Sequence, residues 1–229
     1  MGLFGGSSGG EISGYNCEQV NALRDVINST AEQAGNGIVE RLHNDIVVPM
    51  SSVWYAPEAV DFFEGFATTV KASGENITAA FDAFRGAVES AGKNWAENTG
   101  GEAPSLPAID AVELDLNISD IQPDNGGNVT IDEGQAGTIA GSLTEVEEEI
   151  KSDLESLAEG LNAETAFIGH GQADALQSCF VKVSGEIHKI FKYLTDGEDS
   201  LQGQINKAVQ KYSDVSSGIS DAFNNTGAE

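Results

Sequence analysis

The sequence predicts a mainly α-helical protein, in which two helical hairpins form a four-helix bundle and a small β-hairpin is inserted between them. Apolar residues recur every three or four positions over most of the chain, which is the spacing of one helix face. Three of the five prolines fall in residues 99–136 and separate two helical stretches. Both stretches repeat one order of elements, a helix, a short break and a longer helix, which indicates a duplication in pattern.

The first hairpin is predicted over residues 15–98. Pro49 is expected to end its first helix, because proline lacks the N–H that the next turn needs. Pro57 is expected to be the first residue of the second helix, which then continues to the Asn98–Gly101 break. The apolar stripe of the first helix is Val20, Leu23, Ile27, Ala31, Ala34, Ile38, Leu42 and Ile46.

Residues 99–136 are predicted to be an acidic linker that contains two short strands. They hold no lysine or arginine. Apolar residues nearly alternate over 109–118, and a Gly-rich turn separates them from 128–131, the pattern of a β-hairpin. Asp120, Asp124 and Asp132 do not have the spacing of an EF-hand calcium loop, so an acidic surface is the favoured interpretation.

The second hairpin is predicted over residues 137–229. Its apolar stripes run over 139–161, 176–194 and 201–223, with a break at 167–171. Asp196-Gly197 is expected to kink the last helix.

Residues 1–14 contain six glycines and three serines and are predicted to be a flexible arm. Leu3 and Phe4 are the unusual members of this arm, since a pure spacer needs no phenylalanine. They are therefore candidate contacts with another protein.

The formal net charge of −26, from 37 acidic and 11 basic residues, excludes nucleic acids and anionic membrane surfaces as expected partners. No apolar run reaches the length of a membrane span. The first residues have neither the basic nor the apolar region of a Sec signal peptide. The expectation is a protein made in the cytoplasm without such a signal and then exported or displayed at the cell surface.

The sequence contains no pattern typical of an enzyme, so the chain is expected to be a non-enzyme without a cofactor or metal. His43, His170 and His188 are scattered and form no metal-ligand pair. Cys17 and Cys179 lie far apart in the sequence and form neither a disulfide framework nor a zinc motif. No phosphate-binding loop, dinucleotide fingerprint or nucleophile elbow is present.

The predicted turn between the first two helices carries Trp54, which is followed by Ala59, Phe63 and Phe66. With this arrangement, residues 17–98 resemble the WXG100 (ESAT-6-like) superfamily, small helical-hairpin proteins associated with type VII secretion in Gram-positive bacteria. Ala56 stands where that family has a glycine.

Residues 139–223 resemble a second, more divergent copy of the same hairpin. This copy keeps Gly169 but has Phe167 in place of the tryptophan. The export pattern of the family, a tyrosine four residues before an acidic residue, is missing: Tyr193 is followed by Gly197 and Tyr212 by Ser216.

The resemblance implies a non-enzymatic, exported interaction protein, a type VII secretion substrate, partner or carrier. Its partners would be the secretion machinery, a cognate effector or copies of itself. The alternative is a self-assembling subunit of a filament, sheath or particle, joined through the arm and the β insertion. In either case Trp54 is expected to be a recognition residue or a core residue that fills the gap between two helix ends. The candidate interaction residues are Trp54, Tyr55, Ala56, Phe167, Gly169, Leu3 and Phe4.

Overall fold

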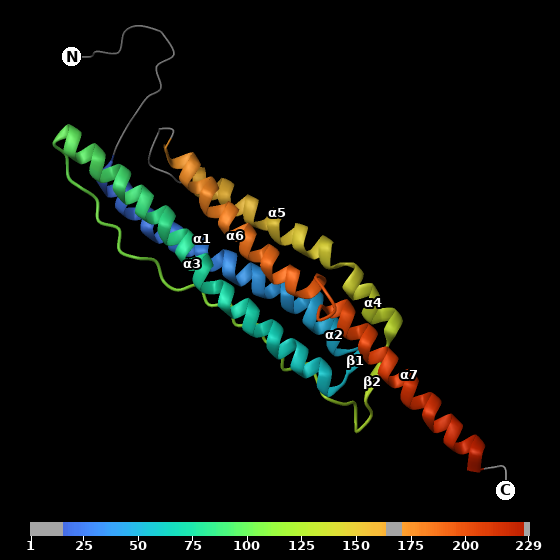
Figure 1. Cartoon of the computed structure of the whole chain (residues 1–229). Coiled ribbons are helices and arrows are strands. Elements are labelled where there is room, and N and C mark those ends of the chain that lie inside the picture. The colour runs from blue at the N-terminus through green and yellow to red at the C-terminus, as the bar shows by residue number, and fades with distance from the viewer. Residues whose placement is uncertain (1–15, 164–170, 227–229) are drawn as a thin grey trace.

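The chain is mainly helical and carries one small antiparallel sheet (Figure 1). The computed structural model describes residues 16–163 and 171–226. Its elements are α1 (Cys17–Leu42), η1 (His43–Val47), α2 (Val48–Ser51), β1 (Trp54–Tyr55), α3 (Pro57–Thr99), β2 (Thr130–Ile131), α4 (Glu133–Gly141), α5 (Leu143–Ala163), α6 (Gly171–Thr195) and α7 (Leu201–Thr226).

The first helical stretch continues past Pro49, where the sequence had predicted its end. The π-helical turn η1 comes directly before this proline, and the Val48 N–H donates to the His43 carbonyl, five residues back. A proline ring clashes with the carbonyl four residues earlier in a regular α-helix. The wider turn relieves this clash, so that the stretch ends only at Ser51.

The second helix begins and ends as predicted. Pro57 is the first residue of α3, behind Ala56 as its extended N-cap. The 43 residues of α3 would extend for about 65 Å at 1.5 Å per residue. Gly100, with φ of 70°, closes it in the left-handed conformation that glycine tolerates best.

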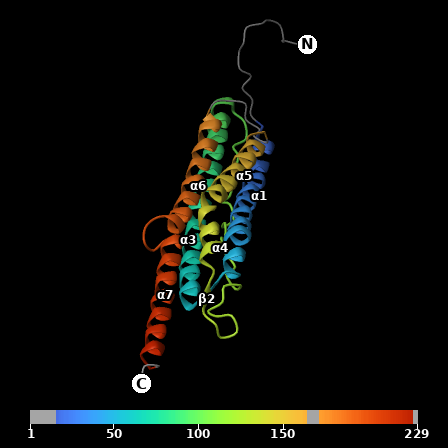
Figure 2. The ribbon, with the colours of Figure 1, turned by 90° about the vertical axis from the view of Figure 1, so that its right-hand side faces the viewer.

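The long helices lie side by side along one axis (Figures 1 and 2). Helix α3 packs against α6, α5 packs against α6, and α1 packs against both α3 and α5. The apolar stripes of α3 and α6 are expected to supply the core. They are buried at these contacts, which confirms that part of the helical pattern: Phe63, Phe81, Phe84, Val183 and Ile187.

Polar contacts fix the helix pairs at specific positions. The Asn76 side chain on α3 donates to Glu186 on α6 over 3.1 Å, and Glu186 is buried. Arg41 on α1 binds Glu149 and Asp153 on α5, with N–O distances of 2.9 and 3.3 Å. These bonds join α3 to α6 and α1 to α5 at defined positions along the helices.

The predicted β-hairpin within 109–131 is wrong. Of its two strands only Thr130–Ile131 forms, and it pairs with Trp54–Tyr55 from the turn before α3. Residues 101–118 are extended but have no strand partner.

Residues 101–122, named here the strap, lie along α1 and α3 (Figure 1). Over 112–116 the strap places alternate side chains into the core, and this explains the period of two that resembled a strand. Its buried residues are Pro104, Leu106, Ile109, Val112, Leu114, Leu116 and Ile121.

The backbone N–H groups of the strap are bound by helix side chains instead of a second strand. The Asp110 N–H donates to the Asn28 side chain over 2.7 Å. The Val112 N–H donates to the Thr78 hydroxyl over 2.8 Å. These acceptors satisfy backbone donors that a neighbouring strand would otherwise have to satisfy.

The second half of the chain contains more breaks than predicted. The predicted helix over 139–161 is preceded by α4 and begins anew at Leu143. The predicted kink at Asp196-Gly197 is a full turn, with Gly197 at φ of 86°. Helix α7 therefore starts afresh at Leu201 and extends beyond the other helices at its C-terminal end (Figures 1 and 2).

Candidate protein-interaction site

Trp54, the leading recognition candidate from the sequence, is fully buried. Its ring lies 6.4 Å from that of Phe62, measured between centroids, and 0% of the residue is exposed. Its Nε1 atom has no hydrogen-bond partner among the described residues. In this arrangement Trp54 fills the space where the first helical stretch turns into α3.

The other candidates from the sequence are divided. Ala56 is buried as the N-cap of α3, and Tyr55 is half-buried in the small sheet. Leu3, Phe4, Phe167 and Gly169 lie outside the described residues. Trp54, Tyr55 and Ala56 therefore lie together at one turn, with two of the three side chains removed from solvent.

Helix α7 carries an apolar stripe whose first half is buried and whose second half is exposed to solvent. Leu201, Ile205 and Ala208 are buried against the body of the molecule. Val215 and Ile219 continue the same stripe, but 54% and 53% of these residues are exposed. The stripe thus extends past the end of the helices that cover its first half (Figure 1).

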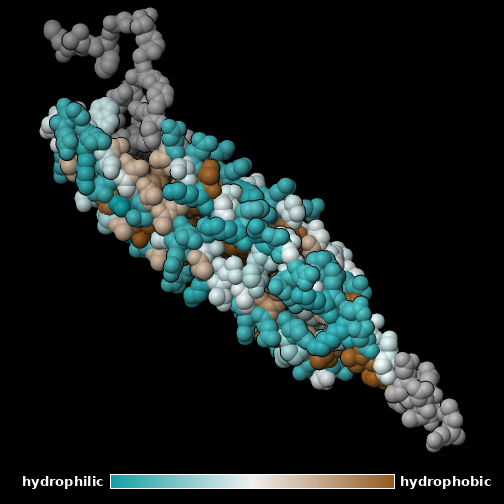
Figure 3. Space-filling view, viewed as in Figure 1, coloured by the Kyte–Doolittle hydropathy of each residue, from teal (hydrophilic) through white to brown (hydrophobic). Residues whose placement is uncertain are grey.

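The transition from covered to uncovered stripe lies at Lys211 and Tyr212. Lys211 pairs with Glu58 at the start of α3. This hydrogen bond is the main reason that the pKa of Glu58 lies below its usual value. Burial raises the pKa of the half-buried Tyr212. Lys211–Thr226 is named here the α7 tip; hydrophobic residues gather on it close to the grey atoms in Figure 3.

The charge of α7 differs from that of the molecule. Its two lysines, Lys207 and Lys211, balance Asp214 and Asp221. Among the long helices that the structure describes, only α6 and α7 carry no net negative charge. A neutral helix with exposed valine and isoleucine is the part of this acidic surface best suited to apolar contact.

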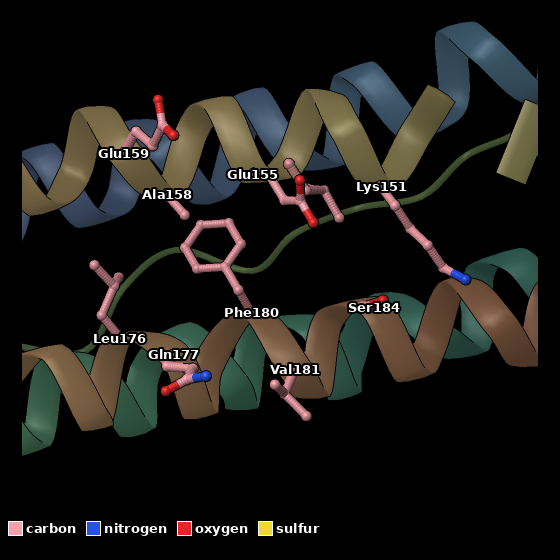
Figure 4. Close-up of a pocket in the computed structure, with 10 residues that line it drawn as sticks. Lys151, Glu155, Ala158, Glu159, Leu176, Gln177, Phe180, Val181 and Ser184 are labelled. Carbon is pink, nitrogen blue, oxygen red and sulfur yellow. The ribbon is translucent and has the colours of Figure 1, made fainter. Parts of the chain in front are cut away.

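A second uncovered apolar surface is a groove of about 540 Å³ between α5 and α6. Figure 4 shows the Phe180 ring lying between the two helices, beside Ala158. Phe180 also packs edge-on against Phe81 at 5.6 Å, which holds the floor of the groove. The apolar lining is Leu154, Ala158, Leu176, Phe180 and Val181.

The rim of the groove is polar. Lys151, Glu155 and Glu159 line it from α5. Val181 is 65% exposed, the largest exposure among the large apolar side chains in the described part of the chain. An apolar floor with a charged rim is the usual composition of a protein contact surface.

Within 16–163 and 171–226, no three His, Cys, Asp or Glu side chains are grouped so that they could hold a metal ion. Burial raises the pKa of the Cys179 thiol to about 12, so it is a poor nucleophile at neutral pH. None of the helices searched in those ranges is long and apolar enough to cross a membrane.

The groove is a feature that the sequence reasoning missed. The sequence contains the apolar stripe of α7, but the exposure of this stripe depends on where the neighbouring helices end, which the sequence pattern does not contain. The exposure of Val181, one residue off the stripe of α6, was the available signal for the groove.

Comparison with known proteins gives no relative. No family model, curated protein or solved structure matches this chain.

Proposed function

We propose that this chain is a non-enzymatic, exported interaction protein that resembles a fused pair of WXG100 hairpins and serves type VII secretion as substrate, partner or carrier. In this proposal α1 with α3 and α5 with α6 are two hairpins that form one four-helix bundle. The pairwise packing of these helices supports that arrangement. Fusion of two hairpins would make assembly independent of protein concentration.

The observation that carries the interaction role is the uncovered half of the α7 stripe. Val215 and Ile219 lie exposed to solvent on one face of a protruding helix. Burying these apolar side chains against a partner is favourable, so the tip is suited to binding. The two sides of the tip also differ, because Ser213 and Ser217 lie on the face opposite Val215 and Ile219. The expected partners are the secretion machinery, a cognate effector or further copies of the chain.

Export can be measured in a Gram-positive host that has a type VII system. The tagged full-length chain is expected in the medium when the secretion ATPase is intact and in the cells when that ATPase is deleted. The double variant Val215→Lys/Ile219→Lys should be retained. The control Ser213→Lys/Ser217→Lys adds the same charge to the opposite face and should be exported normally.

Equal amounts in the medium with and without the ATPase would contradict the secretion route. Normal export of the Val215→Lys/Ile219→Lys variant would contradict the role of the α7 tip. Circular dichroism spectra of both variants serve as the folding control. Unchanged helicity shows that a loss of export is not caused by unfolding.

A self-assembling structural subunit is the second candidate, and one observation favours it. The α5–α6 groove is a second uncovered apolar surface, and it lies near the end of the molecule opposite the α7 tip (Figures 1 and 2). A subunit of a linear assembly needs two different contact surfaces at its two ends.

A further inference from the structure

Two uncovered apolar surfaces lie toward opposite ends of the folded molecule. The α7 tip presents Val215 and Ile219, and the α5–α6 groove presents Phe180, Val181 and Ala158. Within one chain these surfaces cannot meet, because α7 leaves the body in the direction away from the groove (Figures 1 and 2).

We propose that the α5–α6 groove binds the α7 tip of a second copy, so that copies of this chain join head to tail. The inference rests on the proposed function, since it names the partner of the same α7 surface. It goes further in assigning the groove as the receptor and in fixing the geometry of the contact.

The shape of the groove suits a helix. It lies between α5 and α6, over Lys151–Glu159 on one side and Leu176–Ser184 on the other. A helix in a groove is anchored by apolar residues at i and i+4, which is the spacing of Val215 and Ile219. Ser216 and Gly218 flank these anchors on the helix surface and are small enough to allow close approach of the helix.

The charge distribution favours a second copy as the occupant. Residues 1–170 hold 29 of the 37 acidic residues and only 6 of the 11 basic ones. Contacts between two copies through that part would bring strongly negative surfaces together. The groove has α6, which carries no net negative charge, as one wall and α5, which holds seven acidic residues and one lysine, as the other. Helix α7 is neutral, so among the long helices of a second copy it approaches the acidic α5 wall with little repulsion.

The contact is heterologous, because the tip and the groove are different surfaces. The copy that inserts its tip keeps its groove free, and the copy that receives it keeps its tip free, one surface at each end of the pair. Such contacts extend into open chains unless a rotation closes them into a ring.

The test uses two full-length variants that each disable one surface. Val215→Lys/Ile219→Lys places charges on the tip, and Ala158→Lys/Val181→Lys places charges in the groove. Matched controls put two lysines on neighbouring exposed positions outside each surface: Ser213→Lys/Ser217→Lys, and Ser152→Lys/Ser178→Lys. Sedimentation velocity is measured over a range of protein concentrations at about 1 M KCl, where charge repulsion is screened within about 3 Å.

The wild type and both controls are expected to form dimers and longer species as concentration rises. Each disabled variant should associate at least about a hundredfold more weakly, from the cost of burying unpaired charge. The decisive sample is an equal mixture of the two disabled variants. It should form dimers and nothing larger, because only one intact tip and one intact groove remain to join.

Three results would overturn the inference. The wild type could stay monomeric at every concentration, the groove variant could still associate like the wild type, or the mixture could form no dimers. The second result would assign the tip to a symmetric pairing of two α7 helices. A monomeric wild type whose export still depends on Val215 and Ile219 would refute the second copy and leave the proposed function standing.

Discussion

At the scale of single residues, two glycines decide how closely the strap approaches the helices. A Cβ atom on Gly74 would lie 2.6 Å from the Val112 carbonyl oxygen, and one on Gly35 would lie 2.6 Å from Cγ1 of Val112. Both distances are well below van der Waals contact. The strap therefore depends on the absence of side chains at these two helix positions.

Gly74→Ala should destabilise the fold by about 1–3 kcal/mol, because the backbone of the strap has to move. Gly86 lies in the same helix, and a Cβ atom there meets nothing within 4 Å. Gly86→Ala should instead stabilise the helix by about 0.5–1 kcal/mol. Urea titration of both variants measures the difference; equal effects would show that the strap does not lie against α3 in this way.

Trp54 is a packing residue in this structure, which is one of the two roles that the sequence left open for it. Trp54→Phe should lower the free energy of unfolding by only about 1–2 kcal/mol, since it leaves a small cavity but also removes an unpaired buried N–H. Export or partner binding should be unchanged. Loss of either, at an unchanged melting temperature, would make Trp54 a recognition residue.

At the scale of elements, the sequence pattern predicts the helices well and the strap poorly. Heptad spacing reports which face of α3 is buried, and the burial of Phe81 and Phe84 confirms it. Period-two alternation reports only that alternate residues are buried. The alternation does not show whether the neighbour is a strand or a pair of helices. The pattern around Val112 and Leu114 therefore predicts a strand, although these residues pack against helices.

The candidate site was predictable only in part, for a related reason. The apolar character of Val215 and Ile219 is local information, but their exposure depends on where α4 and α3, which pack against the first half of α7, end. Pro49 shows the same limit at the end of a helix, because the π-turn before it has no simple sequence signature.

Asp82 links α3 to the strap, and this link should depend on pH. It accepts hydrogen bonds from Arg85 at 2.7 Å and from the Ile109 N–H at 3.3 Å. The Arg85 hydrogen bond is the main reason that the pKa of the Asp82 carboxyl lies below its usual value. A lowered pKa in the folded state means that the stabilisation is complete above the ordinary aspartate pKa and is lost as pH falls through the lowered one.

Asp82→Asn should therefore lower the free energy of unfolding at neutral pH. The difference from the wild type should shrink below about pH 4, where the carboxyl of the unfolded chain is protonated. Urea titrations of both proteins across this range measure it. A difference that stays constant with pH would mean that the charge of Asp82 does not contribute.

At the scale of the whole molecule, the net charge of −26 is the dominant electrostatic feature. Self-repulsion of this size opposes the compact state, and salt screens it. The melting temperature should rise between about 0.15 and 1 M KCl, as the Debye length falls from about 8 to about 3 Å.

The variant Glu148→Gln/Glu155→Gln, which neutralises two exposed carboxylates of α5, supplies the control. It should melt higher than the wild type at low salt and respond less to KCl. A melting temperature that falls with KCl would indicate that the ion pairs between helices outweigh the repulsion.

Amide hydrogen exchange of the full chain tests directly whether the α7 tip is an uncovered contact surface. Exchange over Lys211–Thr226 should be fast in dilute protein and should slow as concentration rises. Exchange over the α5–α6 groove should slow with it, whereas Val215→Lys/Ile219→Lys should show neither change. Exchange of the tip that is slow in dilute protein, or independent of concentration in the wild type, would contradict the account.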